Sequence, residues 1–100
     1  MIDVSPAQLE TTLKILQNRV PDCEVRAFGS RVRGTAKSYS DLDLVIVGSS
    51  ALPDRMLADL IEDFQESDLS FRVDVIDWNT TSREFRQVIE KKYEVIQKAK

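Results

Sequence analysis

The feature that most constrains the fold is the apolar, β-branched run Leu44-Val45-Ile46-Val47, which follows two aspartates, Asp41 and Asp43, separated by one residue. Such a run predicts a buried strand, and we place it at residues 41–47. Alternate side chains of a strand share a face, so the two carboxylates are expected to point the same way, about 6–7 Å apart. Like charges held so close repel unless a cation lies between them, and oxygen-only ligands favour Mg²⁺ or Mn²⁺.

A second feature, the pair Gly29 and Ser30, lies just upstream and is typical of a phosphate-binding turn. Glycine lets the backbone approach a ligand closely, and amide N–H groups with a hydroxyl at the start of a short helix form an anion site. Arg31 and Arg33 follow this turn, and we predict that at least one of them, preferably Arg31, contacts a triphosphate. Both arginines also fit an ordinary solvated surface.

A third carboxylate, Asp74, lies within an alternating segment predicted to be a strand at residues 71–77. An unpaired carboxylate between two valines would be costly to bury, so a metal ion or an arginine is expected beside it. Asp41 and Asp43 would hold two metal ions, while Asp74 completes the second metal site and lies where a base could act. An isolated Asp-x-Asp often only keeps a strand edge soluble, so the prediction depends on the combination.

Composition excludes several other classes of site and partner. The single Cys23 and the absence of histidine rule out an internal disulfide, a histidine-containing zinc site and a Ser-His-Asp triad. A net charge of −3 argues against a DNA or RNA surface. No long apolar segment or signal peptide is evident, so we predict a cytoplasmic protein that binds no membrane. Its 100 residues suit one domain, residues 1–100.

The remaining patterns predict an α/β domain with the element order αβαβαβα. A first helix begins at Pro6, where Ser5 and Gln8 form a capping box, and Asp77 is expected to cap the turn before the last helix. A capping box of Thr81 and Glu84 opens that last helix, whose apolar stripe is Phe85, Val88, Ile89, Tyr93 and Ile96. The other expected elements are strand 23–28, a short irregular helix within 31–37 and helix 53–64.

Taken together, Gly29-Ser30, Asp41-Leu42-Asp43 and Val73-Asp74-Val75 resemble the signature of the DNA polymerase β-like nucleotidyltransferase superfamily. Residues 29–44 are similar, more narrowly, to the minimal nucleotidyltransferases, or MNT proteins, of prokaryotes. The resemblance implies a mixed sheet flanked by helices. It also implies a nucleotide-phosphate turn at Gly29 and Ser30, and metal-binding, catalytic carboxylates at Asp41, Asp43 and Asp74.

The same resemblance implies a function and a partner. MNT proteins commonly pair with a helical HEPN protein, and several act as its antitoxin by transferring AMP from ATP to a tyrosine of that ribonuclease. We therefore expect a Mg²⁺-dependent adenylyltransferase that uses ATP. Two alternatives stay open: a binding module that neutralises its partner by stoichiometric contact, and nucleotidyl transfer to a small molecule such as an aminoglycoside.

Overall fold

A four-stranded mixed sheet with the strand order β3-β2-β1-β4 organises residues 2–100, the part of the chain that the computed structural model describes. The central strands β1 (Glu24–Phe28) and β2 (Leu42–Val47) are antiparallel. Strand β3 (Val73–Asp77) runs parallel to β2, and β4 (Glu94–Gln97) runs antiparallel to β1. The predicted α/β class, with helices around a small mixed sheet, is confirmed.

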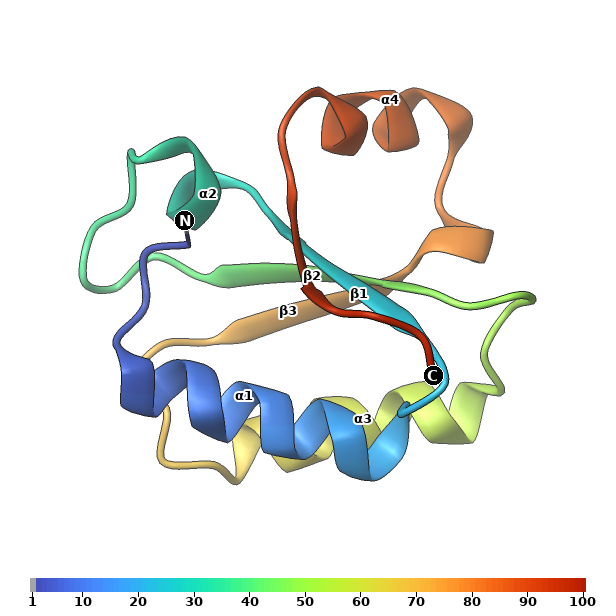
Figure 1. The fold of residues 1–100 in the computed structure, drawn as a ribbon, viewed down its shortest axis with the longest axis horizontal. Coiled ribbons are helices and arrows are strands. Elements are labelled where there is room, and N and C mark those ends of the chain that lie inside the picture. Colours follow the sequence, from blue (N-terminus) through green and yellow to red (C-terminus); the bar gives the residue numbers. More distant parts are fainter. Residues whose placement is uncertain (1) are drawn as a thin grey trace.

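Two long helices, α1 (Pro6–Arg19) and α3 (Asp54–Gln65), lie side by side and cover one face of the sheet (Figure 1). The short helix α2 (Ser30–Arg33) and helix α4 (Arg83–Lys91) lie on the other side, and a 3₁₀ turn, η1 (Trp78–Thr80), follows β3. None of the helices described in residues 2–100 has the length and apolar character that crossing a membrane requires.

The core forms where the sheet packs against α1 and α3. Along β2, Leu42, Leu44 and Ile46 are fully buried on this face, as strand alternation requires. Asp43 and Val45 therefore point to the opposite face, toward α4. The acidic side chain is thus positioned by the same alternation that buries its apolar neighbours.

The predicted start of α1 is confirmed by reciprocal hydrogen bonds. The Gln8 backbone N–H donates to Ser5 Oγ at 3.1 Å, and the Ser5 backbone N–H donates to Gln8 Oε1 at 2.8 Å. Pro6 occupies the first helical position, where no N–H is needed. These contacts satisfy donors that the first turn would otherwise leave free.

The predicted C-terminal helix is wrong at both ends. Ser82, not Thr81, caps α4, since Ser82 Oγ accepts from the Phe85 N–H at 3.1 Å. The helix ends at Lys91, and residues 94–97 form β4 beside β1. The order is therefore αβαβαβαβ, with η1 before α4. Pairing with the open side of β1 outweighs the helical spacing that continues to residue 96.

Candidate active site

The candidate site is built on the two parallel strands β2 and β3. Asp43 and Asp74 are register partners on these strands, so their side chains lie next to each other on the sheet face that carries α4. Asp41 lies one residue before β2 begins. The structure thus brings together the three carboxylates that the sequence analysis selected.

Asp43 is the carboxylate of this cluster whose ionised form its surroundings disfavour. Its half-buried carboxyl loses hydration, and the charges of Asp74 and Asp41 lie close by, so the pKa of Asp43 rises from 3.8 to about 6. Arg33 and Arg72 oppose this rise without cancelling it. A cluster of this kind favours an added cation.

Gly29 packs directly against Asp43. It follows Phe28, the register partner of Asp43, and adopts φ +80°, a conformation that favours glycine. A Cβ at Gly29 would lie 2.2 Å from Asp43 Oδ2. Ser30 begins α2 immediately after this turn. The predicted turn therefore lies beside the acidic cluster. The absence of a side chain at Gly29 lets the Asp43 carboxylate pack against its backbone.

Arg72 is a member of the site that the sequence analysis did not select. Its Nη2 donates to Asp41 Oδ2 at 2.8 Å and its Nε at 3.2 Å, and the Asp41 hydrogen bond raises the pKa of Arg72. Arg72 precedes β3 and shares the face of Asp74. Strand alternation along residues 71–77 places the Arg72 and Asp74 side chains on one face, and this pattern could have identified Arg72 from the sequence.

Arg31 has a different environment from the one expected. Its guanidinium is buried and donates to backbone oxygens of Asp3, Lys37, Ser38 and Ser40, at distances from 2.7 to 3.5 Å. It also lies over the Phe71 ring, 4.1 Å from the centroid. These contacts occupy the donors predicted to bind phosphate. Arg33, by contrast, is exposed, and its charge acts on Asp43.

Asp74 avoids the cost of burying an unpaired carboxylate. Asp74 is exposed at the edge of the sheet, whereas Asp43 on the inner strand is half-buried. The capping role expected for Asp77 is confirmed, since its carboxylate accepts from the N–H groups of Asn79 at 2.9 Å and Leu52 at 2.8 Å. Asp77 is therefore a structural residue outside the cluster.

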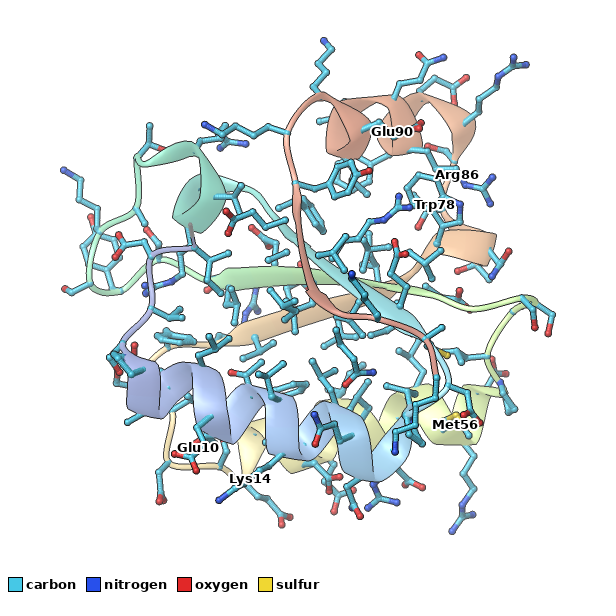
Figure 2. All side chains as sticks on the ribbon, viewed as in Figure 1. Glu10, Lys14, Met56, Trp78, Arg86 and Glu90 are labelled. Atoms are coloured by element: carbon cyan, nitrogen blue, oxygen red, sulfur yellow. The ribbon has the colours of Figure 1, made fainter. Side chains whose placement is uncertain are left out.

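Two arginine guanidinium groups lie against the ring of Trp78. The Arg86 guanidinium of α4 lies 5.1 Å from the Trp78 ring centroid, and Arg86 Nε donates to the Trp78 carbonyl at 2.9 Å (Figure 2). Arg26 of β1 also lies 5.1 Å from this ring. These contacts connect η1, α4 and β1, so Trp78 packs against α4.

The acidic pair offers a partial rather than a complete set of metal ligands. Among residues 2–100, no group of three or more acidic, cysteine or histidine side chains converges into a ready-made cation site. Asp41 is bonded to Arg72, which leaves Asp43 and Asp74 adjacent. Mg²⁺ commonly binds one or two carboxylates and completes its shell with phosphate oxygens and water, so this pair fits a cation that arrives with a nucleotide.

Together, a glycine turn packed against an aspartate of a central strand and a second aspartate alongside it match the arrangement expected of a nucleotidyltransferase. The chain belongs to the nucleotidyltransferase domain family, whose model matches residues 9–99. It is 51% identical over 96 residues to a protein of Haemophilus influenzae named probable protein adenylyltransferase MntA. That match covers 96% of this chain and 84% of the relative.

Solved structures have the same fold. A toxin–antitoxin crystal structure with AMP-PNP matches with a TM-score of 0.77 at 22% identity, covering 92% of this chain and 74% of that one. A Shewanella oneidensis complex of a tri-AMPylated HEPN toxin with an MNT antitoxin matches with a TM-score of 0.71 at 20% identity, covering 93% and 71%. Spectinomycin adenyltransferase from Enterococcus faecialis, with ATP and spectinomycin, matches with a TM-score of 0.57 at 21% identity, covering 92% and 48%.

Proposed function

We propose that this protein transfers AMP from ATP to a tyrosine hydroxyl of a helical HEPN-type toxin and thereby acts as the antitoxin of that pair. The observation that carries the proposal is the Asp43–Asp74 register pair beside Gly29. The 51% identity to a probable protein adenylyltransferase supports the reaction. Fold likeness to an MNT antitoxin in complex with a HEPN toxin supports the partner.

In this proposal the triphosphate lies at the turn formed by Gly29 and Ser30. Arg33 replaces Arg31 as the arginine expected to contact phosphate, because Arg33 is exposed near Asp43 whereas Arg31 is bonded to backbone carbonyls. An exposed guanidinium can donate two hydrogen bonds to a phosphate group without giving up contacts of the fold. Arg31 then keeps the neighbouring loop in place.

Mg²⁺ held by Asp43 and Asp74, with Asp41 as a further ligand, would neutralise the triphosphate and stabilise charge on the leaving pyrophosphate. Arg72 restrains the Asp41 carboxylate through its two hydrogen bonds. The pKa of Asp43 rises to about 6 because its carboxyl is half-buried and because the charges of Asp74 and Asp41 lie close by, and a bound cation would oppose this rise. Mn²⁺ has the same ligand preference and is expected to substitute.

The transfer step requires the tyrosine oxygen to bond to the α-phosphorus while the bond from that phosphorus to the bridging oxygen breaks. Pyrophosphate leaves with the electron pair, and the phenolic proton must pass to a base. Asp74 is exposed at the sheet edge, where an incoming hydroxyl can approach it, so we assign it that role. Since ATP is the donor, we place the reaction in the cytoplasm, which cell fractionation checks.

The experiment combines the purified protein, Mg²⁺ and α-phosphate-labelled ATP with the HEPN-type protein from the same host. Wild type is expected to label the partner, whereas Asp43→Asn is expected to leave it unlabelled while still folding. Asp22→Asn is the matched control, because Asp22 lies exposed in the turn before β1, away from the cluster. Equal labelling by wild type and Asp43→Asn contradicts the site. Equal partner binding and neutralisation without labelling favours the stoichiometric binder.

A further inference from the structure

Strand β3 is an open edge of the sheet. It pairs with β2 on one side, and no further strand among residues 2–100 pairs with its other side. The Arg72 carbonyl accepts from the Leu42 N–H at 2.9 Å, so the backbone N–H and C=O of Arg72 point toward β2. The N–H and C=O of a residue share one side of a strand, and this side alternates from residue to residue, so those of Val73 and Val75 point outward. An unpaired edge of this kind is a template for another strand.

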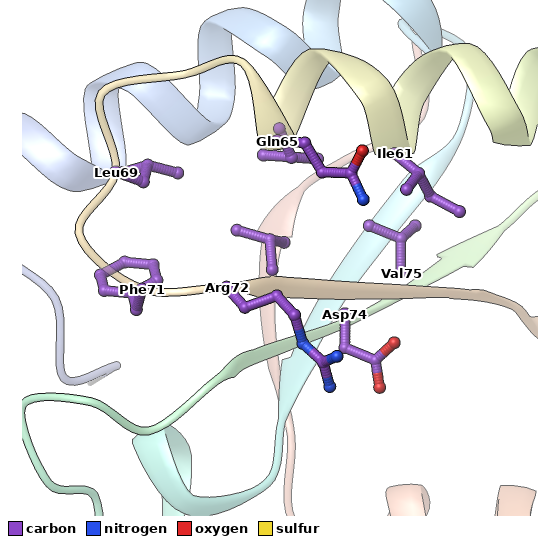
Figure 3. A pocket seen from close by; sticks show the side chains of 9 residues that line it. Ile61, Gln65, Leu69, Phe71, Arg72, Asp74 and Val75 are labelled. Atoms are coloured by element: carbon purple, nitrogen blue, oxygen red, sulfur yellow. The ribbon is translucent and has the colours of Figure 1, made fainter.

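A pocket of about 330 Å³ opens beside this edge (Figure 3). Ile61 and Gln65 of α3 lie on one side of β3, whereas the side chains of Arg72 and Asp74 extend on the other. The lining is otherwise apolar and comprises Phe64, Leu69, Phe71, Val73 and Val75. Its volume lies at the low end for binding pockets, so it suits a side chain rather than a large cofactor.

The strand order places this edge on the far side of the acidic cluster from the phosphate turn. Gly29 follows β1, Asp43 lies on β2, and Asp74 lies on β3. A triphosphate at the turn and an acceptor at the edge would therefore reach the carboxylates from opposite sides. This arrangement suits an in-line transfer, in which the acceptor oxygen and the leaving group lie on opposite sides of the phosphorus.

We propose that the acceptor binds as an extended peptide segment that pairs with the open edge of β3 and inserts an apolar side chain into the adjoining pocket. Since neighbouring side chains of a strand point to opposite faces, the residue next to the inserted one lies on the face of Asp74. A tyrosine there presents its hydroxyl to Asp74. This inference rests on the proposed function and identifies how that site takes its acceptor.

Three observations together favour a peptide as the occupant. Outward N–H and C=O groups at Val73 and Val75 are satisfied best by another backbone. The pocket lies on the apolar face of the same strand, where a flanking side chain of that backbone would enter. Asp74 both lines the pocket and pairs in register with Asp43, so the pocket adjoins the candidate active site across strand β3.

The test compares the substitutions Gln65→Trp and Gln17→Trp. Both positions are exposed and helical, but only Gln65 lines the pocket. Two tyrosine peptides, one with valine and one with glutamate on both sides of the tyrosine, serve as acceptors beside the folded HEPN-type partner. Gln65→Trp is expected to lower kcat/KM for the valine peptide and the partner by about tenfold, the loss typical of a blocked anchor pocket. The ATP affinity of Gln65→Trp should stay at the wild-type level. The ATP affinity and the kcat/KM values of Gln17→Trp should also equal those of wild type.

A second readout tests strand pairing directly. Amide hydrogen exchange at Val73 and Val75 is expected to slow when the valine peptide is present at saturating concentration, and not with the glutamate peptide. Unchanged exchange, equal labelling by Gln65→Trp, or loss of ATP affinity in that variant overturns the peptide-docking proposal. Slowed exchange caused by the protein alone at high concentration assigns the edge to a second copy and also overturns it.

These outcomes separate the two proposals. Wild type that labels the folded partner but neither peptide overturns the docking proposal and leaves the proposed function standing. Wild type that labels no acceptor of any kind contradicts the proposed function itself. Labelling of the valine peptide in preference to the glutamate peptide, lost in Gln65→Trp, supports both.

Discussion

At the scale of single residues, Gly29 is fixed by two separate constraints, its backbone conformation and its contact with Asp43. Its φ is +80°, and a Cβ there would lie 2.2 Å from Asp43 Oδ2. Gly34 has nearly the same φ, +81°, but an added Cβ would meet nothing within 4 Å. Gly34→Ala is therefore expected to cost about 1–2 kcal/mol from strain alone, and Gly29→Ala about 2–3 kcal/mol because the Asp43 side chain must also shift.

Denaturant unfolding of the two variants measures this difference, and labelling of the partner shows whether the displaced Asp43 still supports transfer. Gly29→Ala is expected to lose most activity, whereas Gly34→Ala keeps it. Equal losses of unfolding free energy in the two variants would show that the close approach of Gly29 to Asp43 has no energetic consequence.

Asp43 makes the stability of the metal-free protein depend on pH. Its pKa is 3.8 without the fold and about 6 within it, so the folded state binds the proton more tightly. The resulting stabilisation is complete below pH about 4 and is lost as the pH rises through about 6. Asp43→Asn removes this loss, so at pH 7 the variant should be more stable than wild type by about 1–2 kcal/mol, a discounted value for a half-exposed carboxyl.

Urea unfolding of both proteins from pH 4 to pH 8, in the presence of a chelator, checks this prediction. The two stability curves should coincide near pH 4, diverge as the pH rises from about 4 to about 6, and stay a constant distance apart above that. Parallel curves over the whole range would mean that burial and the neighbouring carboxylates do not raise the pKa of Asp43. The same variant is expected to lose AMP transfer, so stability and activity change in opposite directions.

At the scale of elements, Arg31 ties α2 to the segment that leads into β2. Its guanidinium donates to the backbone oxygens of Asp3, Lys37, Ser38 and Ser40. Arg31→Met removes the hydrogen bonds that a buried guanidinium makes to these oxygens, so we expect a loss of about 3 kcal/mol in unfolding free energy. Arg33→Met is the matched control, and it should leave stability unchanged while raising the KM for ATP.

Denaturation midpoints and ATP kinetics, measured on both variants, separate the structural role from the phosphate-binding role. A stable Arg31→Met protein with a raised KM would restore Arg31 as the phosphate ligand expected from the sequence. An unchanged KM in Arg33→Met would remove Arg33 from the triphosphate site.

Local signals predicted most of these elements, and a long-range pairing accounts for the main error. The capping box of Ser5 and Gln8 marks the start of α1, because each partner is a near neighbour in sequence. Tyr93 and Ile96 continue the helical spacing of α4, yet residues 94–97 form β4. What decides between the two is the open side of β1, together with Gln97 Nε2, which donates to the Val20 and Cys23 carbonyls at 2.9 Å.

The site shows the same division between local and distant causes. Strand parity predicted that Asp41 and Asp43 point the same way, because alternation is a property of each strand. It could not show that β3 is an edge of the sheet, where Asp74 is exposed. The contacts of Arg31 with Asp3 and of Arg72 with Asp41 join segments distant in sequence, and no local pattern reports them.

At the scale of the whole molecule, the two faces of the sheet differ in how they are covered. Helices α1 and α3 pack on one face over the main hydrophobic core, and Arg19 of α1 bonds to Asp63 of α3 at 2.6 Å. On the other face, α4 buries Ile89 but leaves Phe85 41% exposed and Val88 51% exposed. The central strands β1 and β2 contribute side chains to both faces, which should couple the two layers.

We therefore predict that residues 1–100 unfold as one cooperative domain, and Trp78 gives a direct check. Trp78 lies between Arg26 of β1 and Arg86 of α4, so its fluorescence reports the α4 side. Far-UV circular dichroism reports mainly α1 and α3, the longest helices. The two probes should give the same urea midpoint, because a two-state domain has no populated intermediate. A Trp78 transition at lower urea would show that α4 opens while the core stays folded, and would contradict the single-domain prediction.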